Sequence, residues 1–308
     1  MKILPIQDVY VRKFERQKRI KELEYHAAGH CVHIGKISPG CISCFVPDKY
    51  SRNISAGPYC NCTCDYCASG AAWHSVDKKV EAQHSLRFEM DSIALKKEAL
   101  LPDYNPKKIS FSGGGETLKY LDTITLYMNL FQNIHKQLKS KPWYFLYTNG
   151  LLATESNLKT LKDLGFNEIR FHLGASNFSE KVYDNMYKAV KYIKTVSVET
   201  PAWPFHRKEL FEMLPRIQDI GVKHLNITEP EINTNNFEAI SKLVPDGEIC
   251  QCGELQLYDN GLVYDLMEEV IRNKFTFSVL DCNCFVKSMQ RTAGKWLLHE
   301  SVEGLCAQ

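Results

Sequence analysis

Stretches with helical spacing of apolar residues alternate with short, nearly continuous apolar stretches over most of this chain. A helix is predicted over residues 81–100, and a buried strand over residues 107–111 runs into a glycine-rich turn. The alternation then continues, with helices predicted over 119–139, 157–165, 179–193, 207–221 and 261–274, and strands over 142–150, 167–175, 194–202, 222–230 and 275–284.

Short connections between alternating strands and helices imply parallel strands joined by right-handed crossovers. The pattern therefore predicts an α/β fold, either a doubly wound sheet or a full or partial (βα) barrel. The N-terminal part differs. The first 20 or so residues are charged and predict a short strand or helix, and residues 25–59 are rich in Gly, Pro, Ser, His and Cys with no sustained period, which predicts an irregular segment.

Composition limits the partners that the chain can attract. The 308 residues carry 38 basic and 36 acidic side chains, a formal charge of +2, so no strong field favours nucleic acid or an anionic membrane. The chain has no run of about 18 apolar residues, so no membrane span is predicted. The first residues lack the apolar core of a secretory signal, and we therefore expect a cytoplasmic protein without membrane or nucleic-acid partners.

Clustered cysteines change this picture, because in a reducing compartment they indicate metal ligands before disulfides. Cys60, Cys64 and Cys67 have the spacing C-x3-C-x2-C among the chain's 12 cysteines. Three thiolates this close can hold a cubane iron–sulfur cluster and leave its fourth iron without a protein ligand. The alternative is a zinc knuckle that also uses Cys62.

Two turns follow at strand ends. Ser112-Gly113-Gly114-Gly115-Glu116 comes about 50 residues after the cysteines, and its glycines let the backbone approach a small polar ligand closely. It is not a P-loop, since the lysine and the Ser/Thr are missing. Thr148-Asn149-Gly150 ends the next strand and is by itself only a turn.

In this order, the cysteine motif, the GGE turn and the TNG turn resemble the radical S-adenosylmethionine (SAM) superfamily, with looser similarity to the branch of pyruvate formate-lyase activating enzymes. The resemblance implies a partial (βα)6 barrel with an irregular Cys/His-rich N-terminal segment. It also implies a [4Fe-4S] cluster on the three cysteines, with SAM beside it. The residues implied in SAM binding are Tyr66, Gly113, Gly114, Gly115, Glu116, Thr148, Asn149 and Glu199.

The implied activity is reductive cleavage of SAM, after which the 5′-deoxyadenosyl radical abstracts hydrogen from a peptide, protein or small-molecule substrate. Such an enzyme needs an electron donor such as flavodoxin or ferredoxin. The alternative is a non-catalytic zinc-binding scaffold that retains the barrel. Candidate catalytic residues are Glu199 and Glu229, which lie near the ends of predicted strands, and Cys284.

Residues outside the barrel motifs suggest a second metal site. Cys41 and Cys44 precede the predicted barrel, and Cys282 and Cys284 end its last strand, so the two pairs are candidate ligands for a second [4Fe-4S] cluster or for zinc. The predicted division is an N-terminal extension over 1–50 with a metal-binding loop, a radical SAM core over 51–235, and a C-terminal extension over 236–308 that packs on the barrel.

Overall fold

The structure, a computed structural model, describes residues 1–26, 31–42, 48–69, 78–112, 114–139, 141–251, 255–283 and 285. The chain divides into two compact units. We call Tyr50–Ser197 the central unit, and Met1–Lys49 together with Val198–Gln308 the terminal unit. Each is described by itself, and β8 (Thr195–Pro201) carries the chain from the first into the second.

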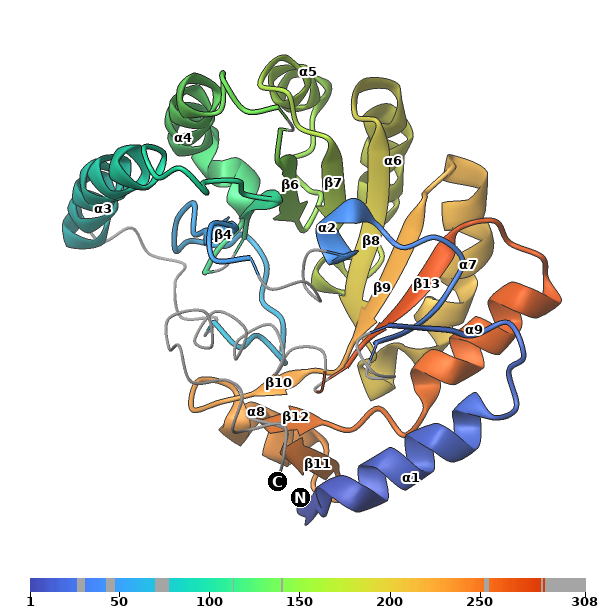
Figure 1. Ribbon diagram of the computed structural model, residues 1–308. Helices are drawn as coiled ribbons and strands as arrows, with labels where there is room; N and C mark the ends of the chain where they lie inside the picture. Colours follow the sequence, from blue (N-terminus) through green and yellow to red (C-terminus); the bar gives the residue numbers. More distant parts are fainter. Residues whose placement is uncertain are drawn as a thin grey trace. The chain divides into compact units, whose positions relative to one another are not determined.

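The central unit is built on four parallel strands. They are adjacent in chain order: β4 (Arg52–Ile54), β5 (Lys108–Phe111), β6 (Trp143–Thr148) and β7 (Glu168–Phe171). The connecting helices form an outer row beside these strands (Figure 1): α3 (Lys78–Glu98), α4 (Leu121–Ile134), α5 (Glu155–Asp163) and α6 (Glu180–Tyr192). All four strands end at the same edge, so the turns that follow them are neighbours.

Apolar side chains on both faces of the strands explain this arrangement. Phe111 and Leu146 are fully buried on adjacent strands, and α4 contributes Met128 and Phe131 to the core. Strands that are apolar on both faces are typical of parallel sheets covered by helices. The core therefore holds the strand ends, and polar residues collect in the turns beyond them.

The terminal unit combines two sheets. In one, β9 (His224–Thr228) is parallel to β13 (Ser278–Cys282), to which β3 (Cys31–Ile34) and then β2 (Glu24–His26) add antiparallel. The smaller sheet has the order β1 (Lys2–Leu4), β11 (Glu248–Gln251), β12 (Leu255–Leu257) and β10 (Glu231–Ile232). The helices are α1 (Ile6–Gln17), α2 (Pro39–Ile42), α7 (Arg207–Ile220), α8 (Phe237–Leu243) and α9 (Leu262–Arg272).

The predicted α/β class with mostly parallel strands is confirmed. The strand predicted over 167–175 ends at Phe171, because the next residues form a 3-10 turn, Leu173–Ser176, capped by the side chain of His172. Residues 25–59 contain strands and a short helix where an irregular segment was expected. The three-part domain division stays a prediction. Among the described helices, none is both long and apolar enough to span a bilayer.

A buried ion pair fixes α1 in the terminal unit. The Lys13 ammonium lies 2.8 Å from Glu229 Oε1 and 3.6 Å from Asp281 Oδ2, with all three side chains almost fully buried. Tyr264 donates its hydroxyl hydrogen to Asp281 at 2.8 Å and accepts a hydrogen bond from Gln17 at 2.9 Å. The positive charge of Lys13 therefore balances the buried carboxylates of Glu229 and Asp281.

We expect Lys13→Met to lower the free energy of unfolding by about 3–5 kcal/mol, because it leaves buried carboxylates without their cation. Lys18→Met is the matched control at the C-cap of the same helix. Lys18 pairs with Glu15 at the surface, so this substitution should cost less than about 1 kcal/mol. Urea unfolding measures both. Equal, small losses would show that the buried pair does not hold α1 in place.

Candidate active site

Backbone contacts join the glycine turn to the start of the cysteine loop. Gly115 N–H donates to Gly57 O at 3.0 Å, and Glu116 N–H donates to Tyr59 O at 2.8 Å. A Cβ on Gly115 would lie 2.1 Å from Tyr59 O, and Gly114 has φ +71°, so side chains are excluded at both positions. The glycines therefore let the backbone of the cysteine loop approach the end of β5.

The Glu116 carboxylate joins the glycine turn to the turn that ends β6. Its Oε1 accepts hydrogen bonds from Thr148 Oγ1 at 2.6 Å and from Leu118 N at 3.0 Å, and its Oε2 accepts from Asn149 N at 2.7 Å. Burial raises the pKa of Glu116 to about 7, although the three hydrogen bonds oppose the shift. The carboxylate thus holds two strand ends together.

Asn149 extends these contacts to the cysteine loop. Its Nδ2 donates hydrogen bonds to Asn61 Oδ1 at 2.6 Å and to Cys60 Sγ at 3.8 Å. Its Oδ1 accepts from Leu151 N at 3.1 Å, which shapes the turn itself. The three sequence motifs, about 90 residues apart at their extremes, therefore meet at one end of the central sheet.

The thiols of this loop differ in their electrostatic environment. A hydrogen bond from the Cys62 thiol, helped by the Asn149 amide, lowers the pKa of Cys60 to about 6. Burial and the nearby Cys67 and Cys60 thiols raise the pKa of Cys64 to about 12. The four cysteines are partly buried, so they are shielded from bulk solvent but not sealed in the core.

Within the described ranges, no three His, Cys, Asp or Glu side chains gather closely enough to hold a single metal ion. A cubane cluster does not require such a gathering, because each thiolate binds a different iron. Three thiolates spaced as C-x3-C-x2-C on one loop fit the ligand set of a cubane cluster.

Tyr66 lies on the same loop and stacks on His172 with ring centroids 6.0 Å apart and planes 9° from parallel. His172 Nδ1 accepts from Ala175 N at 3.0 Å, so the imidazole is held by the turn after β7. Burial raises the pKa of the Tyr66 phenol above its usual range. The aromatic pair connects the cysteine loop with a third strand end.

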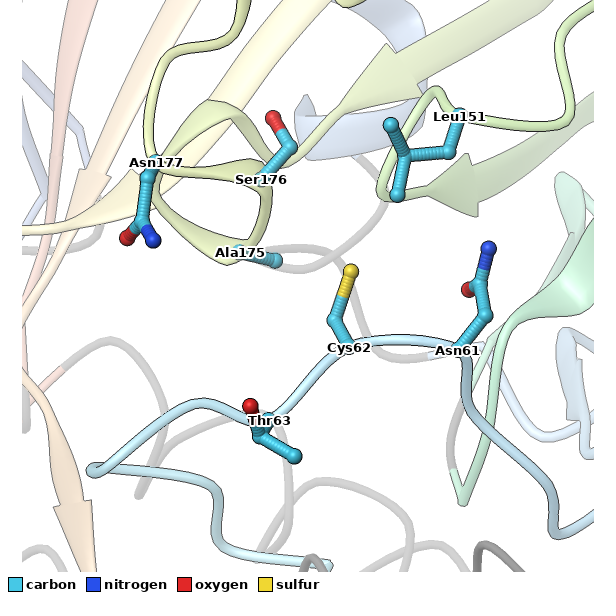
Figure 2. A pocket seen from close by; sticks show the side chains of 7 residues that line it. All are labelled: Asn61, Cys62, Thr63, Leu151, Ala175, Ser176 and Asn177. Atoms are coloured by element: carbon cyan, nitrogen blue, oxygen red, sulfur yellow. The ribbon is translucent and has the colours of Figure 1, made fainter.

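A cleft of about 420 Å³ opens between the cysteine loop and the turns after β6 and β7. Figure 2 shows the Cys62 side chain directed toward the turn after β7. Left-handed backbone at Asn177 (φ 49°) gives this turn its shape at the wall of the cleft. The cleft is lined by Asn61, Cys62, Thr63, Leu151, Ala175, Ser176 and Asn177.

Other candidate residues lie in the terminal unit. Glu199 accepts a hydrogen bond from Asn226 Nδ2 at 3.0 Å, and Glu229 is held in the buried pair with Lys13. The predicted catalytic and SAM-binding roles of these two residues stay predictions. Gly113, Cys44 and Cys284 lie outside the described residues.

For the predicted second metal site, the structure describes one cysteine of each pair, Cys41 and Cys282. Cys41 belongs to a buried cluster with Cys31, Ile37 and Leu280, and Cys282 packs against this cluster. Asn226 Nδ2 donates to Cys41 Sγ at 3.4 Å. Cys41 and Cys282, far apart in sequence, thus pack in one cluster of side chains, and the shared metal site stays a prediction.

Residues 54–198 match the family model described as the radical SAM superfamily. A curated protein of Methanocaldococcus jannaschii, named as a glycyl-radical enzyme activating enzyme, is 27% identical over 219 residues, which cover 67% of this chain and 54% of the relative. The chain thus spans about half the length of that relative.

Solved structures show the same fold. SuiB from Streptococcus suis has a TM-score of 0.50 at 11% identity, over 89% of this chain and 59% of SuiB. Its SAM-bound form has a TM-score of 0.50 at 12% identity, over 75% of this chain and 49% of SuiB.

Residues 54–198 therefore carry the radical SAM domain that the motifs predicted. The domain match and the relative's name support an enzyme of the radical SAM class, with similarity to the branch of activating enzymes. The cofactors of this family are a [4Fe-4S] cluster and SAM.

The sequence motifs missed two residues of this site. Asn61 Oδ1 accepts a hydrogen bond from the Asn149 amide, and Tyr59 supplies the carbonyl against which the glycine turn packs. Neither has a local signal, because an asparagine or a tyrosine beside a cysteine is common in loops. Their roles come from contacts between segments that are distant in sequence.

We expect Glu116 to make stability depend on pH. Its folded pKa of about 7 lies above the ordinary value of 4.5, so its contribution is fully present below about pH 4.5 and is lost as pH rises through about 7, by about 3 kcal/mol at most. Glu116→Ala should flatten this decrease of the free energy of unfolding with pH. Glu155→Ala is the exposed control on α5, and it should leave the decrease unchanged. An unchanged pH profile in Glu116→Ala would contradict the assignment.

Proposed function

We propose that this chain reductively cleaves SAM at a [4Fe-4S] cluster held by Cys60, Cys64 and Cys67. The observation that carries the proposal is the convergence of three motifs at one sheet end through Glu116 and Asn149. With the cofactors bound, the reduced cluster would supply the electron for cleavage of a carbon–sulfur bond of SAM, and SAM would supply the 5′-deoxyadenosyl radical that takes hydrogen from the substrate.

The chain's own residues would bind and orient the cofactors. The Gly115 N–H already donates to Gly57 O, so we propose that backbone carbonyls of the glycine turn accept hydrogen bonds from the methionine amine of SAM, since no side chain covers them. Tyr66, stacked on His172, offers an aromatic face for the adenine. The partial burial of the cysteine loop limits access of water to the reactive centre.

For the substrate, we propose a peptide or a protein. The name of the M. jannaschii relative, a glycyl-radical enzyme activating enzyme, supports a protein partner on which the radical acts. A small molecule is the remaining option. The electron would come from a one-electron donor such as flavodoxin or ferredoxin. A zinc scaffold is not favoured, because residues 54–198 match the radical SAM superfamily and the M. jannaschii relative is named as an activating enzyme.

We expect Cys60→Ala, Cys64→Ala and Cys67→Ala each to abolish SAM cleavage, because each removes a ligand from the cluster. Cys62→Ala is the matched control on the same loop and should retain most of the activity, since it falls outside the three-ligand spacing. The assay is 5′-deoxyadenosine formation after anaerobic reconstitution with iron and sulfide, followed by reduction with SAM present. A Cys60 variant that keeps the cluster while the Cys62 variant loses it would refute the ligand assignment.

We also propose a second cluster that uses Cys41 and Cys282, supported by their shared buried cluster, with Cys44 and Cys284 as further ligands. Wild-type protein should then hold about eight irons per chain, because each cubane contributes about four. The triple variant Cys60→Ala/Cys64→Ala/Cys67→Ala should retain about half of the iron. A triple variant with neither iron nor zinc would rule out the second site.

A further inference from the structure

Asn149 has a contact that SAM binding does not explain. Of its side-chain atoms, Oδ1 accepts from Leu151 N within its own turn, whereas Nδ2 points at the cysteine loop, 2.6 Å from Asn61 Oδ1 and 3.8 Å from Cys60 Sγ. The side chain is buried, with 5% of the residue exposed. Its two donor hydrogens are therefore directed at the loop that carries the proposed cluster.

The backbone of Asn149 is fixed from the other side. Its N–H donates to Glu116 Oε2 at 2.7 Å, and the same carboxylate accepts from Thr148 at 2.6 Å. Gly150 follows with φ +82° and packs so closely that a Cβ would lie 2.5 Å from Val182 Cγ1. The turn cannot shift easily, so the amide is held in place before any cofactor binds.

We propose that Asn149 is a positioning residue for the cluster ligand Cys60 and that its amide raises the reduction potential of the cluster. This inference rests on the proposed function, since it requires the cluster on Cys60. An N–H directed at a ligand sulfur stabilises the reduced cluster more than the oxidised one, because the reduced cluster carries more negative charge. The amide of Asn61 helps to orient Asn149 but is not the group that acts on sulfur.

The test is a redox titration of the reconstituted wild-type protein and of Asn149→Ala, without SAM, followed by electron paramagnetic resonance. We expect the variant to be reduced about tenfold less at a given potential, which equals a downward shift of about 59 mV for a one-electron couple. Omission of SAM matters, because a residue that contacts SAM alone would leave the SAM-free potential unchanged.

Asn149→Asp is the second variant. It keeps an oxygen for Leu151 N–H but loses both donors and adds negative charge, so the potential should shift in the same direction and at least as far. Asn157→Ala is the control, because Asn157 Nδ2 donates to Leu152 O and the residue has no role in the proposed site. Its potential should equal that of the wild type. Circular dichroism verifies that the variants are folded, and a folded Asn149 variant that takes up less iron would also support the positioning role.

Three results would overturn the inference. Unchanged SAM-free potentials in both Asn149 variants of a protein that cleaves SAM would refute it alone and leave the proposed function standing. An equal shift in Asn61→Ala would show that loop anchoring, not the bond to sulfur, sets the potential. A wild-type protein that takes up no [4Fe-4S] cluster would refute the proposed function and this inference together.

Discussion

The buried carboxylate of Glu116 is the contact on which the rest of the site depends. Placing an acid in the core costs free energy unless its oxygens are satisfied, and here they accept hydrogen bonds from Leu118, Thr148 and Asn149. Because these partners come from the ends of two neighbouring strands, the carboxylate fixes both ends at once. The cysteine loop then packs against this fixed base through the glycine turn and through Asn149.

The GGE motif carries out two structural tasks in this protein. Side chains are excluded at Gly115 by the backbone of Tyr59 and at Gly114 by Gly57 and a positive φ. The Glu116 carboxylate is buried and accepts hydrogen bonds from the protein, and its role in SAM binding stays a prediction. With the N–H groups of Gly115 and Glu116 bonded to the cysteine loop, we expect a bound cofactor to meet backbone carbonyls of the turn and not side chains. A rigid, preorganised turn of this kind lowers the cost of ordering the site when the cofactor binds.

Local pattern was sufficient for the fold class and for the place of the motifs. The βα alternation, the strand before the glycines and Thr148-Asn149 at the next strand end all came from periodicity and turn residues. Strands β10 and β12 were missed, because they have only two and three residues and are defined by their partners. The contacts of Asn149 with Cys60, and of Lys13 with Glu229, join residues 89 and more than 200 positions apart, so no local signal could reveal them.

The most direct test of the central claim is electron paramagnetic resonance of the reduced, reconstituted wild-type protein with and without SAM. If the three motifs form one site, the protein will show a reduced [4Fe-4S] signal that changes when SAM is added, because SAM binds the iron that has no cysteine ligand. A cluster signal that is indifferent to SAM, or the absence of a cluster after reconstitution, would contradict the account.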